Sequence, residues 1–326
     1  MRLPFLATLR RAAVLCAAAL AAAPALAAFP DKPIKIVVPF APGVGTDLIA
    51  RTMGIVMAQD LGQPVIIDNK PGAGTIIGTD AVAKSPPDGT TLVMATFAHV
   101  VNPSLQPKLP FDWEKSFAPV MLVGRSPNVL VVRPDSPHRS VKELIAAAKA
   151  HPGQLSFASQ GSGTSAHLAG ELFKSLTGTH ITHIPYRGAG PALTDLLGGQ
   201  VDMMFATASA AGPFIQSGKL RALGVPPTER SPSAVLAGVP PIAQTVPGYA
   251  ADSWYALLVP AGTPEPVIAR LNAAARKAAQ SDIFRTKVEP EGLVVNAGTP
   301  QELAAYLKAE EARWRKVVKS ANITAD

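Results

Sequence analysis

Short apolar runs alternate with longer stretches of helical spacing along most of this chain, and this rhythm constrains the fold more than any other feature. Apolar runs of this kind are typical of buried strands, and the stretches between them have the period of helices. An order of strand, helix, strand, helix is typical of parallel sheets that helices cover on both faces. The sequence therefore predicts an α/β fold. The expected strands cover residues 34–38, 65–68, 91–95, 118–123, 128–133, 155–159, 182–185, 201–206 and 254–259, and the expected helices cover 46–59, 75–84, 164–176 and 191–197.

Capping residues mark further helix starts. Thr263 before Pro264 predicts a helix with threonine as the N-cap and proline in the first position. Two more helix starts have the spacing of a capping box, namely Ser140 with Glu143 and Thr299 with Glu302. Six prolines between residues 226 and 247 interrupt the strand–helix rhythm. No repeat of 20–50 residues divides the chain, so a solenoid is excluded.

Length and composition indicate a folded protein of two domains. The chain has 326 residues, and a domain holds roughly 150. Hydrophobic residues make up 48% of it and charged residues only 16%, whereas a charged share of about 25% is usual. This composition supports a large core and excludes a disordered tail or a coiled coil.

The N-terminus has the pattern of a cleavable secretory signal peptide over residues 1–27. Arg2, Arg10 and Arg11 precede an unbroken apolar stretch at residues 12–23, and an Ala-x-Ala site follows at residues 25–27. An apolar stretch of this length is too short to span a bilayer as a helix. An N-terminal membrane anchor is the alternative. We expect a soluble protein in the periplasm.

Cleavage at that site removes the single cysteine. Cys16 follows Leu15, where processing of a lipoprotein needs a small residue, so we interpret Cys16 as part of the signal peptide. The mature chain then has no disulfide, no thiol nucleophile and no cysteine-ligated metal. It keeps 27 basic residues against 23 acidic ones, and no basic run exceeds two residues. A nucleic-acid-binding stripe is therefore not expected.

Three glycine-rich turns, at residues 39–47, 69–75 and 159–165, each follow a predicted strand and precede a predicted helix. Glycine lets the backbone approach a ligand closely, and the N–H groups at a helix start are unpaired and carry partial positive charge. Together these features bind a carboxylate or a phosphate without a lysine or an arginine. A tight turn with no ligand is the alternative for any one of them. We expect ligand contacts from Phe40, Ala41, Gly43, Gly45, Thr46 and Asp47 in the first turn, from Gly74 and Thr75 in the second, and from Ser159, Gly161, Thr164 and Ser165 in the third.

The usual enzyme motifs are missing. The spacing of Gly72, Gly74 and Gly78 does not match the dinucleotide-binding fingerprint. His180 and His183 point to opposite faces of a strand, so a structural histidine is favoured over a metal pair there. His99, after the strand at 91–95, is either a ligand contact or a packed side chain. Asp47 either caps its own helix or orients a ligand. No catalytic residue, cofactor or metal is expected.

The chain resembles the Bug family, the periplasmic solute-binding receptors of tripartite tricarboxylate transporters. The resemblance covers nearly all of the mature chain. It is carried by blocks at residues 39–47 (PFAPGVGTD), 68–74 (DNKPGAG), 85–89 (SPPDG), 161–168 (GSGTSAHL), 186–188 (YRG), 191–202 (PALTDLLGGQVD), 254–255 (WY) and 258–264 (LVPAGTP).

The resemblance implies a two-lobe, Venus-flytrap periplasmic binding protein of type II with two strands that cross the hinge. One lobe would take residues 28–132 and 254–326, and the other would take 133–253. A small carboxylate would bind between the lobes through backbone groups and water, with Arg187, Gly188 and Thr207 also near it. The partners implied are that ligand and the permease subunits of a transporter, and we expect a monomer.

The sequence departs from the family pattern at two places in these turns. Val44 stands where the family usually has glycine, and Thr75-Ile76 stand where it usually has Gly-Asn. These departures predict a pocket that prefers a bulkier or less polar acid.

Two other functions remain open from the sequence alone. The first is a secreted hydrolase that uses Ser159, Ser162 or Ser165 with His99 or His167. The second is a sensor lobe that signals instead of feeding transport.

Overall fold

The computed structural model describes residues 29–43, 45–106, 108–226, 234–288, 292–320 and 323–324. The predicted signal peptide and Val44 lie outside the described residues. Among those that are described, no helix is both long and apolar enough to cross a membrane.

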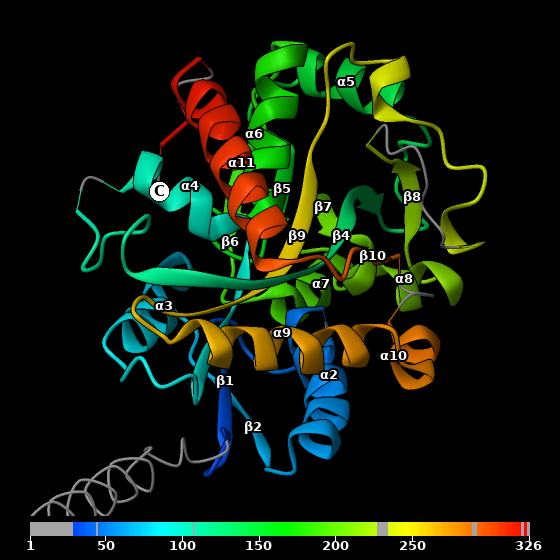
Figure 1. Cartoon of the computed structure of the whole chain (residues 1–326). Helices are drawn as coiled ribbons and strands as arrows, with labels where there is room; N and C mark the ends of the chain where they lie inside the picture. The colour runs from blue at the N-terminus through cyan, green and yellow to red at the C-terminus, as the bar shows by residue number, and fades with distance from the viewer. Residues whose placement is uncertain are drawn as a thin grey trace, which may run out of the picture.

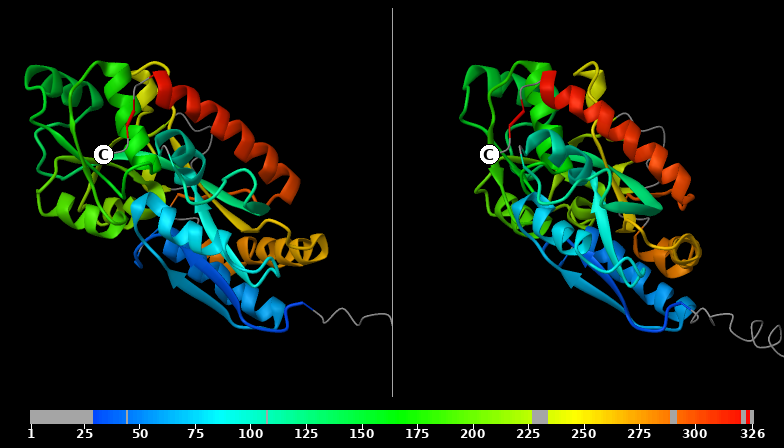
Figure 2. Two further views of the ribbon diagram at one scale, coloured as in Figure 1. Left: turned by 90° about the vertical axis from the view of Figure 1, so that its left-hand side faces the viewer. Right: turned by 60° about the vertical axis from the view of Figure 1, so that its left-hand side comes forward.

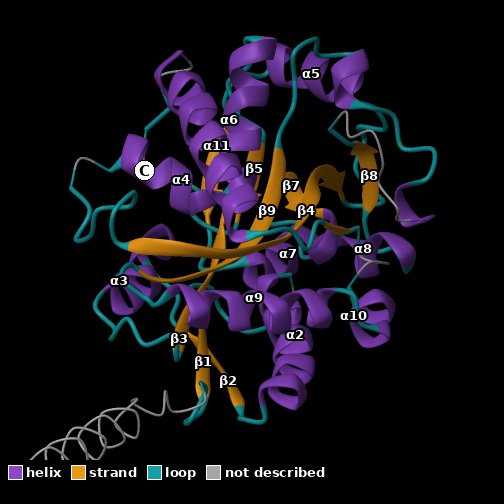
Figure 3. Cartoon of the chain, viewed as in Figure 1, coloured by secondary structure: helices purple, strands orange, loops and turns teal. Residues whose placement is uncertain are grey.

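A mixed sheet forms the centre of the molecule, with strand order β2-β1-β3-β9-β4-β7-β5-β6 (Figures 1 and 3). We call the part with β1, β2, β3 and β9 the first lobe, and the part with β5, β6, β7 and β8 the second lobe. The strands of the first lobe are β1 (Ile34–Val38), β2 (Val65–Asn69), β3 (Thr91–Thr96) and β9 (Asp252–Pro260). Those of the second lobe are β5 (Ser156–Ser159), β6 (Thr182–Pro185), β7 (Met203–Thr207) and β8 (Arg221–Gly224). The pairs β1–β2, β1–β3, β5–β6 and β5–β7 are parallel, as the alternation predicts.

One long strand, β4 (Phe117–Val132), belongs to both lobes. It pairs with β9 from Phe117 to Pro127 and with β7 from Asn128 to Val132. The prediction of two separate strands at 118–123 and 128–133 is therefore wrong. The polar residues between those runs continue the strand because their backbones pair with the start of β9, for example Ser126 with Ser253.

Helices cover both faces of each lobe, and Figure 2 shows the green second lobe at one end and the blue and orange elements of the first lobe at the other. Alternate residues of β1 pack to opposite sides, so that Ile34 and Ile36 contact one core and Val37 another. The helices of the first lobe are α2 (Thr46–Leu61), α3 (Ile76–Ala83), α4 (Phe97–Leu105), α9 (Glu265–Ala279), α10 (Asp282–Lys287) and α11 (Pro300–Ser320). Those of the second lobe are α5 (Val141–Ala150), α6 (Ser165–Thr177), α7 (Ala189–Leu197) and α8 (Ala208–Gln216). A short strand, β10 (Val294–Val295), pairs with β4.

The predicted capping box at Thr299 forms, because the Thr299 N–H donates to the Glu302 carboxylate at 2.7 Å and the Glu302 N–H donates to the Thr299 hydroxyl at 3.2 Å. At Ser140 only half of the predicted box forms. The Glu143 N–H donates to the Ser140 hydroxyl at 3.2 Å, but the Glu143 carboxylate accepts from the N–H of Arg139 at 2.7 Å. The prediction for Thr263 is wrong. Its hydroxyl donates to the carbonyl of Pro260 at 2.7 Å, at the end of β9, and α9 begins only at Glu265.

Gly170 allows α6 to lie close to β5. A Cβ at this position would lie 2.3 Å from the ring of Phe157. We expect Gly170→Ala to lower the free energy of unfolding by about 1–3 kcal/mol through overpacking, although alanine favours a helix by roughly 1 kcal/mol. Urea denaturation measures the change. Gly190→Ala is the control, since a Cβ there meets nothing within 4 Å. A Gly170→Ala protein as stable as wild type would contradict this packing.

Asp252 stands where the chain enters β9 and pairs with Pro127 of β4. Burial raises its pKa to about 6, against the opposing effect of Arg125 and Arg313, and Glu310 adds to the rise. Its Oδ1 is buried without a hydrogen-bond partner within the described part of the chain.

The raised pKa of Asp252 gives a testable pH dependence of stability. The folded protein keeps the Asp252 proton up to about pH 6, whereas the unfolded chain loses it near the ordinary aspartate pKa of 3.8. Wild type therefore loses stability between these two values as the pH rises. We expect Asp252→Asn to gain about 2–3 kcal/mol relative to wild type on going from pH 4 to pH 7. Urea denaturation across this range checks it, with Asp135→Asn as control because that side chain is 75% exposed. A difference between Asp252→Asn and wild type that does not change with pH would contradict the prediction.

Candidate functional site

A small cavity of about 20 Å³ lies where the turns of the two lobes meet. Its volume is close to the space of one water molecule, so the lobes are close together in this structure. The lining residues come from both lobes, and they are Phe40, Ala41, Gly45, Thr46, Gln160, Ala189, Gly190, Thr207 and Tyr255. Neither a lysine nor an arginine is among them.

Three helices begin at this cavity. Thr46 is the first residue of α2, Ala189 is the first residue of α7, and Thr207 directly precedes α8. All three residues line the cavity. No N-cap side chain accepts a hydrogen bond at any of these three helix starts. Such N–H groups carry a positive partial charge and attract anions. The cavity is therefore suited to a carboxylate or another small anion.

The carboxylate of Asp47 stabilises the first turn through hydrogen bonds to other residues of the protein. Its Oδ2 accepts hydrogen bonds from the Gly43 N–H at 3.1 Å and from Arg51 at 2.8 Å. The Asn69 amide donates to Asp47 Oδ1 at 2.9 Å and to the carbonyl of Phe40 at 3.1 Å. Burial raises the pKa of Asp47, but the hydrogen bonds from Arg51, Asn69 and Gly43 outweigh it, and the pKa is lowered overall. Asp47 and Gly43 thus shape the turn while Phe40, Ala41, Gly45 and Thr46 line the cavity.

The second turn touches the opposite lobe and does not line the cavity. A Cβ on Gly74 would lie 2.6 Å from the carbonyl oxygen of Ser162, so only glycine fits at this contact. The amide of Asn102 on α4 donates to the carbonyl of Gly74 at 2.9 Å and fixes the turn. Thr75 is buried behind it, and neither Thr75 nor Ile76 is among the cavity residues.

His99 is buried behind the second turn. Its Nδ1 accepts from the Thr96 N–H at 3.0 Å, which leaves the proton on Nε2, 2.9 Å from the hydroxyl of Thr79. That hydroxyl in turn donates to the carbonyl of Thr75 at 2.8 Å. Burial lowers the pKa of His99 to about 4, against the opposing effect of the Thr96 carbonyl, which lies 3.1 Å from Nδ1, so the ring is neutral. His99 therefore supports the turn and does not line the cavity.

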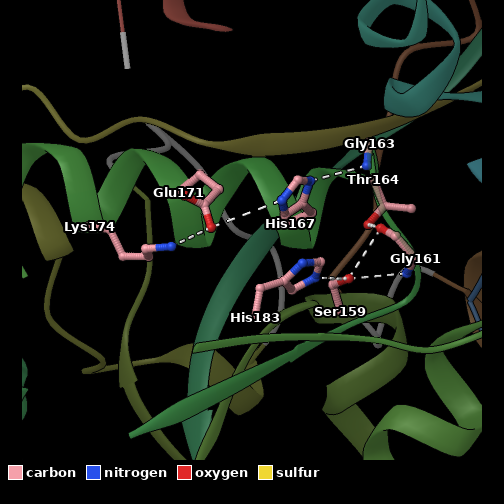
Figure 4. Close-up of polar contacts among 8 residues, drawn as sticks. All are labelled: Ser159, Gly161, Gly163, Thr164, His167, Glu171, Lys174 and His183. Atoms are coloured by element: carbon pink, nitrogen blue, oxygen red, sulfur yellow. Dashed lines mark hydrogen bonds and ion pairs between the residues drawn. The ribbon is translucent and has the colours of Figure 1, made fainter. Parts of the chain in front are cut away.

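The third turn contributes Gln160 to the cavity, while its predicted residues are engaged inside the second lobe (Figure 4). The Thr164 hydroxyl donates to the carbonyl of Gly161 at 2.6 Å. The Ser165 hydroxyl donates to Asn128 on β4 at 3.1 Å. Ser159 is fully buried, and its Oγ lies 2.7 Å from Nε2 of His183 on β6.

The serine–histidine pairs expected for a hydrolase do not appear among these contacts. Ser159 pairs with His183, and not with His99 or His167. His167 Nδ1 instead accepts from the Gly163 N–H at 3.1 Å, and the His167 ring stacks on the His183 ring at a centroid distance of 4.2 Å. Within the described ranges, no group of three or more His, Cys, Asp or Glu residues is placed to hold a metal ion.

The family resemblance also predicts that Arg187 and Gly188 lie near the ligand, and both belong to a fourth turn, between β6 and α7. A Cβ on Gly188 would lie 3.5 Å from Cβ of Ala41, so the two lobes also approach each other here. Arg187 is exposed and is absent from the cavity lining, whereas the next residues, Ala189 and Gly190, are part of it.

Sequence reasoning missed Gln160, Ala189, Gly190 and Tyr255. The Tyr255 hydroxyl lies 3.1 Å from the Ser209 hydroxyl, which donates to Thr207 at 3.3 Å, so Tyr255 connects β9 with the start of α8. A signal for Tyr255 was present, because it lies in one of the blocks that carry the resemblance to the Bug family.

Comparison with known proteins agrees with this geometry. The family model described as "Tripartite tricarboxylate transporter family receptor" matches residues 49–323. Protein BugT of Bordetella pertussis is 39% identical over 294 residues, which cover 89% of this chain and 90% of BugT.

Solved structures show the same fold. The Rhodopseudomonas palustris protein Rpa4515 with adipate is 35% identical with a TM-score of 0.87, covering 91% of this chain and 100% of that one. MatC of the same organism with bound malate is 35% identical with a TM-score of 0.84, covering 89% of this chain and 100% of MatC. The fold is thus that of a two-lobe periplasmic binding protein, as predicted. The chain therefore belongs to the tripartite tricarboxylate transporter receptor family, and its similarity to BugT confirms the predicted resemblance to the Bug family.

Proposed function

We propose that this protein is a periplasmic receptor that captures a small organic carboxylate between its lobes and presents it to the permease subunits of a transporter. The observation that supports this most strongly is that three helix starts from both lobes, none with a hydrogen-bonded N-cap side chain, meet at one cavity, and that the described residues lining it include no lysine or arginine. Relatives with 35% identity hold adipate and malate, which supports a carboxylate for this chain. Export through the predicted signal peptide and a monomeric state are parts of the same proposal.

Binding requires the lobes to separate and close again. A cavity of about 20 Å³ is far smaller than a dicarboxylate, and direct contacts between the lobes surround it. These contacts join Gly74 to Ser162 and Gly188 to Ala41. An acid that contacts helix starts in both lobes binds the closed form better than the open form, and this difference drives closure.

The predicted binding residues divide into two groups in this proposal. Ligand contacts come from Phe40, Ala41, Gly45, Thr46 and Thr207, together with Gln160, Ala189, Gly190 and Tyr255. Support for the turns comes from Gly43, Asp47, Gly74, Thr75, His99, Ser159, Gly161, Thr164, Ser165 and Gly188. Arg187, exposed beside the cavity, attracts the anion without a direct contact.

We also propose the lobe boundaries expected from the family, with 28–132 and 254–326 in one lobe and 133–253 in the other. Two observations support them. β4 changes its partner from β9 to β7 after Pro127. Tyr249 packs against Phe205 of the second lobe, and the chain then enters β9, which pairs with β3 of the first lobe.

The contacts of Ser159 favour a receptor over a hydrolase. A nucleophilic serine must reach its substrate, whereas the Ser159 side chain is completely buried and held by His183. The Ser165 hydroxyl is also engaged, with Asn128. A sensor role would use the same binding site and differ only in the partner.

Binding of a panel of mono-, di- and tricarboxylates by the mature chain tests the function. We expect saturable heat of binding in calorimetry for at least one dicarboxylate, together with a smaller radius of gyration in X-ray scattering. Turnover of generic esters that is lost in Ser159→Ala, with no acid bound, would contradict the receptor and favour the hydrolase.

The proposal that Thr207 contacts the ligand, whereas Arg187 only attracts it, gives a second prediction. We expect Thr207→Val to weaken binding of the acid found in that panel about tenfold, because the variant lacks a hydroxyl at the start of α8. We expect Arg187→Ala to weaken it less than threefold, and only at low salt, since an exposed charge is screened. Calorimetry at two salt concentrations measures both. A larger loss of affinity in Arg187→Ala than in Thr207→Val would place the ligand at the Arg187 guanidinium and contradict a site at the helix starts.

A further inference from the structure

We propose that His183 is a positioning residue for the ligand site. Its Nε2 holds the hydroxyl of Ser159, and this hydroxyl fixes the third turn, which lines the cavity and touches the first lobe. The inference rests on the proposed function and names the side chain that holds one wall of that site in position.

The Ser159 hydroxyl joins His183 to the backbone of the turn (Figure 4). Its Oγ lies 2.7 Å from His183 Nε2, accepts from the Gly161 N–H at 3.1 Å and lies 3.1 Å from the Gly161 carbonyl. A hydroxyl has a single proton to donate. The Thr164 hydroxyl already donates to the Gly161 carbonyl at 2.6 Å, and Ser159 Oγ lies closer to His183 Nε2 than to that carbonyl. His183 is therefore the main partner of the Ser159 hydroxyl.

His183 is itself held between two rings. It stacks on Phe157 at a centroid distance of 4.8 Å and on His167 at 4.2 Å. These contacts come from β5 and α6, the two elements on either side of the third turn. The ring is therefore well placed to hold a side chain at the end of β5.

The second ring of the stack fixes the far end of the same turn. His167 Nδ1 accepts from the Gly163 N–H at 3.1 Å, so its proton is on Nε2, which lies 4.0 Å from the Glu171 carboxylate. Glu171 is paired with Lys174 at 2.7 Å. The stacked histidines thus hold Gly161 through Ser159 and hold Gly163 directly, and the backbone between them has little freedom.

Residues 160–163 of the third turn, next to these attachments, face the cavity and the first lobe. Gln160 lines the cavity. A Cβ on Gly74 would lie 2.6 Å from the Ser162 carbonyl, and a Cβ on Gly163 would lie 2.6 Å from Oδ1 of Asn102. With separations this small, a shift of the turn alters both the cavity wall and the contact that closes the lobes.

Four variants test the role of His183 in the full mature chain. His183→Phe keeps a ring for stacking but removes Nε2, and His183→Gln keeps a terminal amide that reaches the place of Nε2. Ser159→Ala removes the hydroxyl, and the fourth variant combines Ser159→Ala with His183→Phe. His151→Phe is the control because His151 is an exposed histidine of the same lobe. Circular dichroism and thermal unfolding establish that each variant folds.

Two measurements are made on each variant. Hydrogen exchange of peptides covering residues 159–165 is followed without ligand, and the dissociation constants for malate and adipate are measured by calorimetry. We expect His183→Phe and Ser159→Ala each to speed exchange in this segment and to weaken binding about tenfold. The double variant should be no weaker than either single variant, because both remove one interaction. His183→Gln should remain within threefold of wild type.

The inference is overturned if His183→Phe exchanges and binds as wild type does, if His183→Gln is as weak as His183→Phe, or if the two single effects add. A wild-type protein that binds no carboxylate of the panel would count against the proposed function. Exchange in the unliganded variants would still decide the role of His183.

Discussion

Unpaired backbone N–H groups at helix starts are the constraint on which the rest of this structure depends. The first turn of a helix cannot satisfy its own donors, so each start needs a side-chain cap, water or a ligand. Other helices of this chain use caps, such as Ser140 on α5 and Ser281 on α10. The starts of α2, α7 and α8 have no side-chain cap and meet at one cavity. At the start of α8 the Ser209 N–H donates to the hydroxyl of Ser126 at 3.3 Å, whereas at the starts of α2 and α7 no N-cap side chain engages the donors where an anion would bind.

The two lobes bring these helix starts together because one strand is shared. β4 pairs with β9 on the first-lobe side and with β7 on the second-lobe side, so both sets of turns lie near the same strand. Close contacts of glycines then let the turns meet, as at Gly74 and Gly188. Behind the turns, Asp47 accepts from Gly43 of the first turn, His99 contacts the Thr79 hydroxyl that donates to Thr75 of the second, and His183 contacts the Ser159 hydroxyl of the third.

Much of this arrangement was predictable because it follows from local patterns. The strand–helix alternation predicted the α/β fold. Five cavity residues were expected, four from the first glycine-rich turn and Thr207 from the family resemblance. The continuous strand β4 was not, since the polar residues at its centre look like an interruption until their partners on β9 are known. The helices α4 and α8 were missed because each has an internal proline and begins directly after the last residue of a strand.

Side-chain roles that depend on distant partners were the hardest to predict. Nothing near Ser159 in the sequence shows that its partner is His183, 24 positions further on. His99 was left open between ligand contact and packing, and only its bonds to Thr96 and Thr79 show that it supports the second turn. Gln160 and Gly190 reach the cavity through the close approach of the lobes, which no local pattern describes.

A crystal structure of the mature chain with a bound dicarboxylate tests the central claim most directly. The account predicts carboxylate oxygens within hydrogen-bond distance of backbone N–H groups at the starts of α2 and α7, with the lobes closed around the acid. A carboxylate held mainly by a lysine or arginine side chain, or bound outside the contact between the lobes, would contradict it.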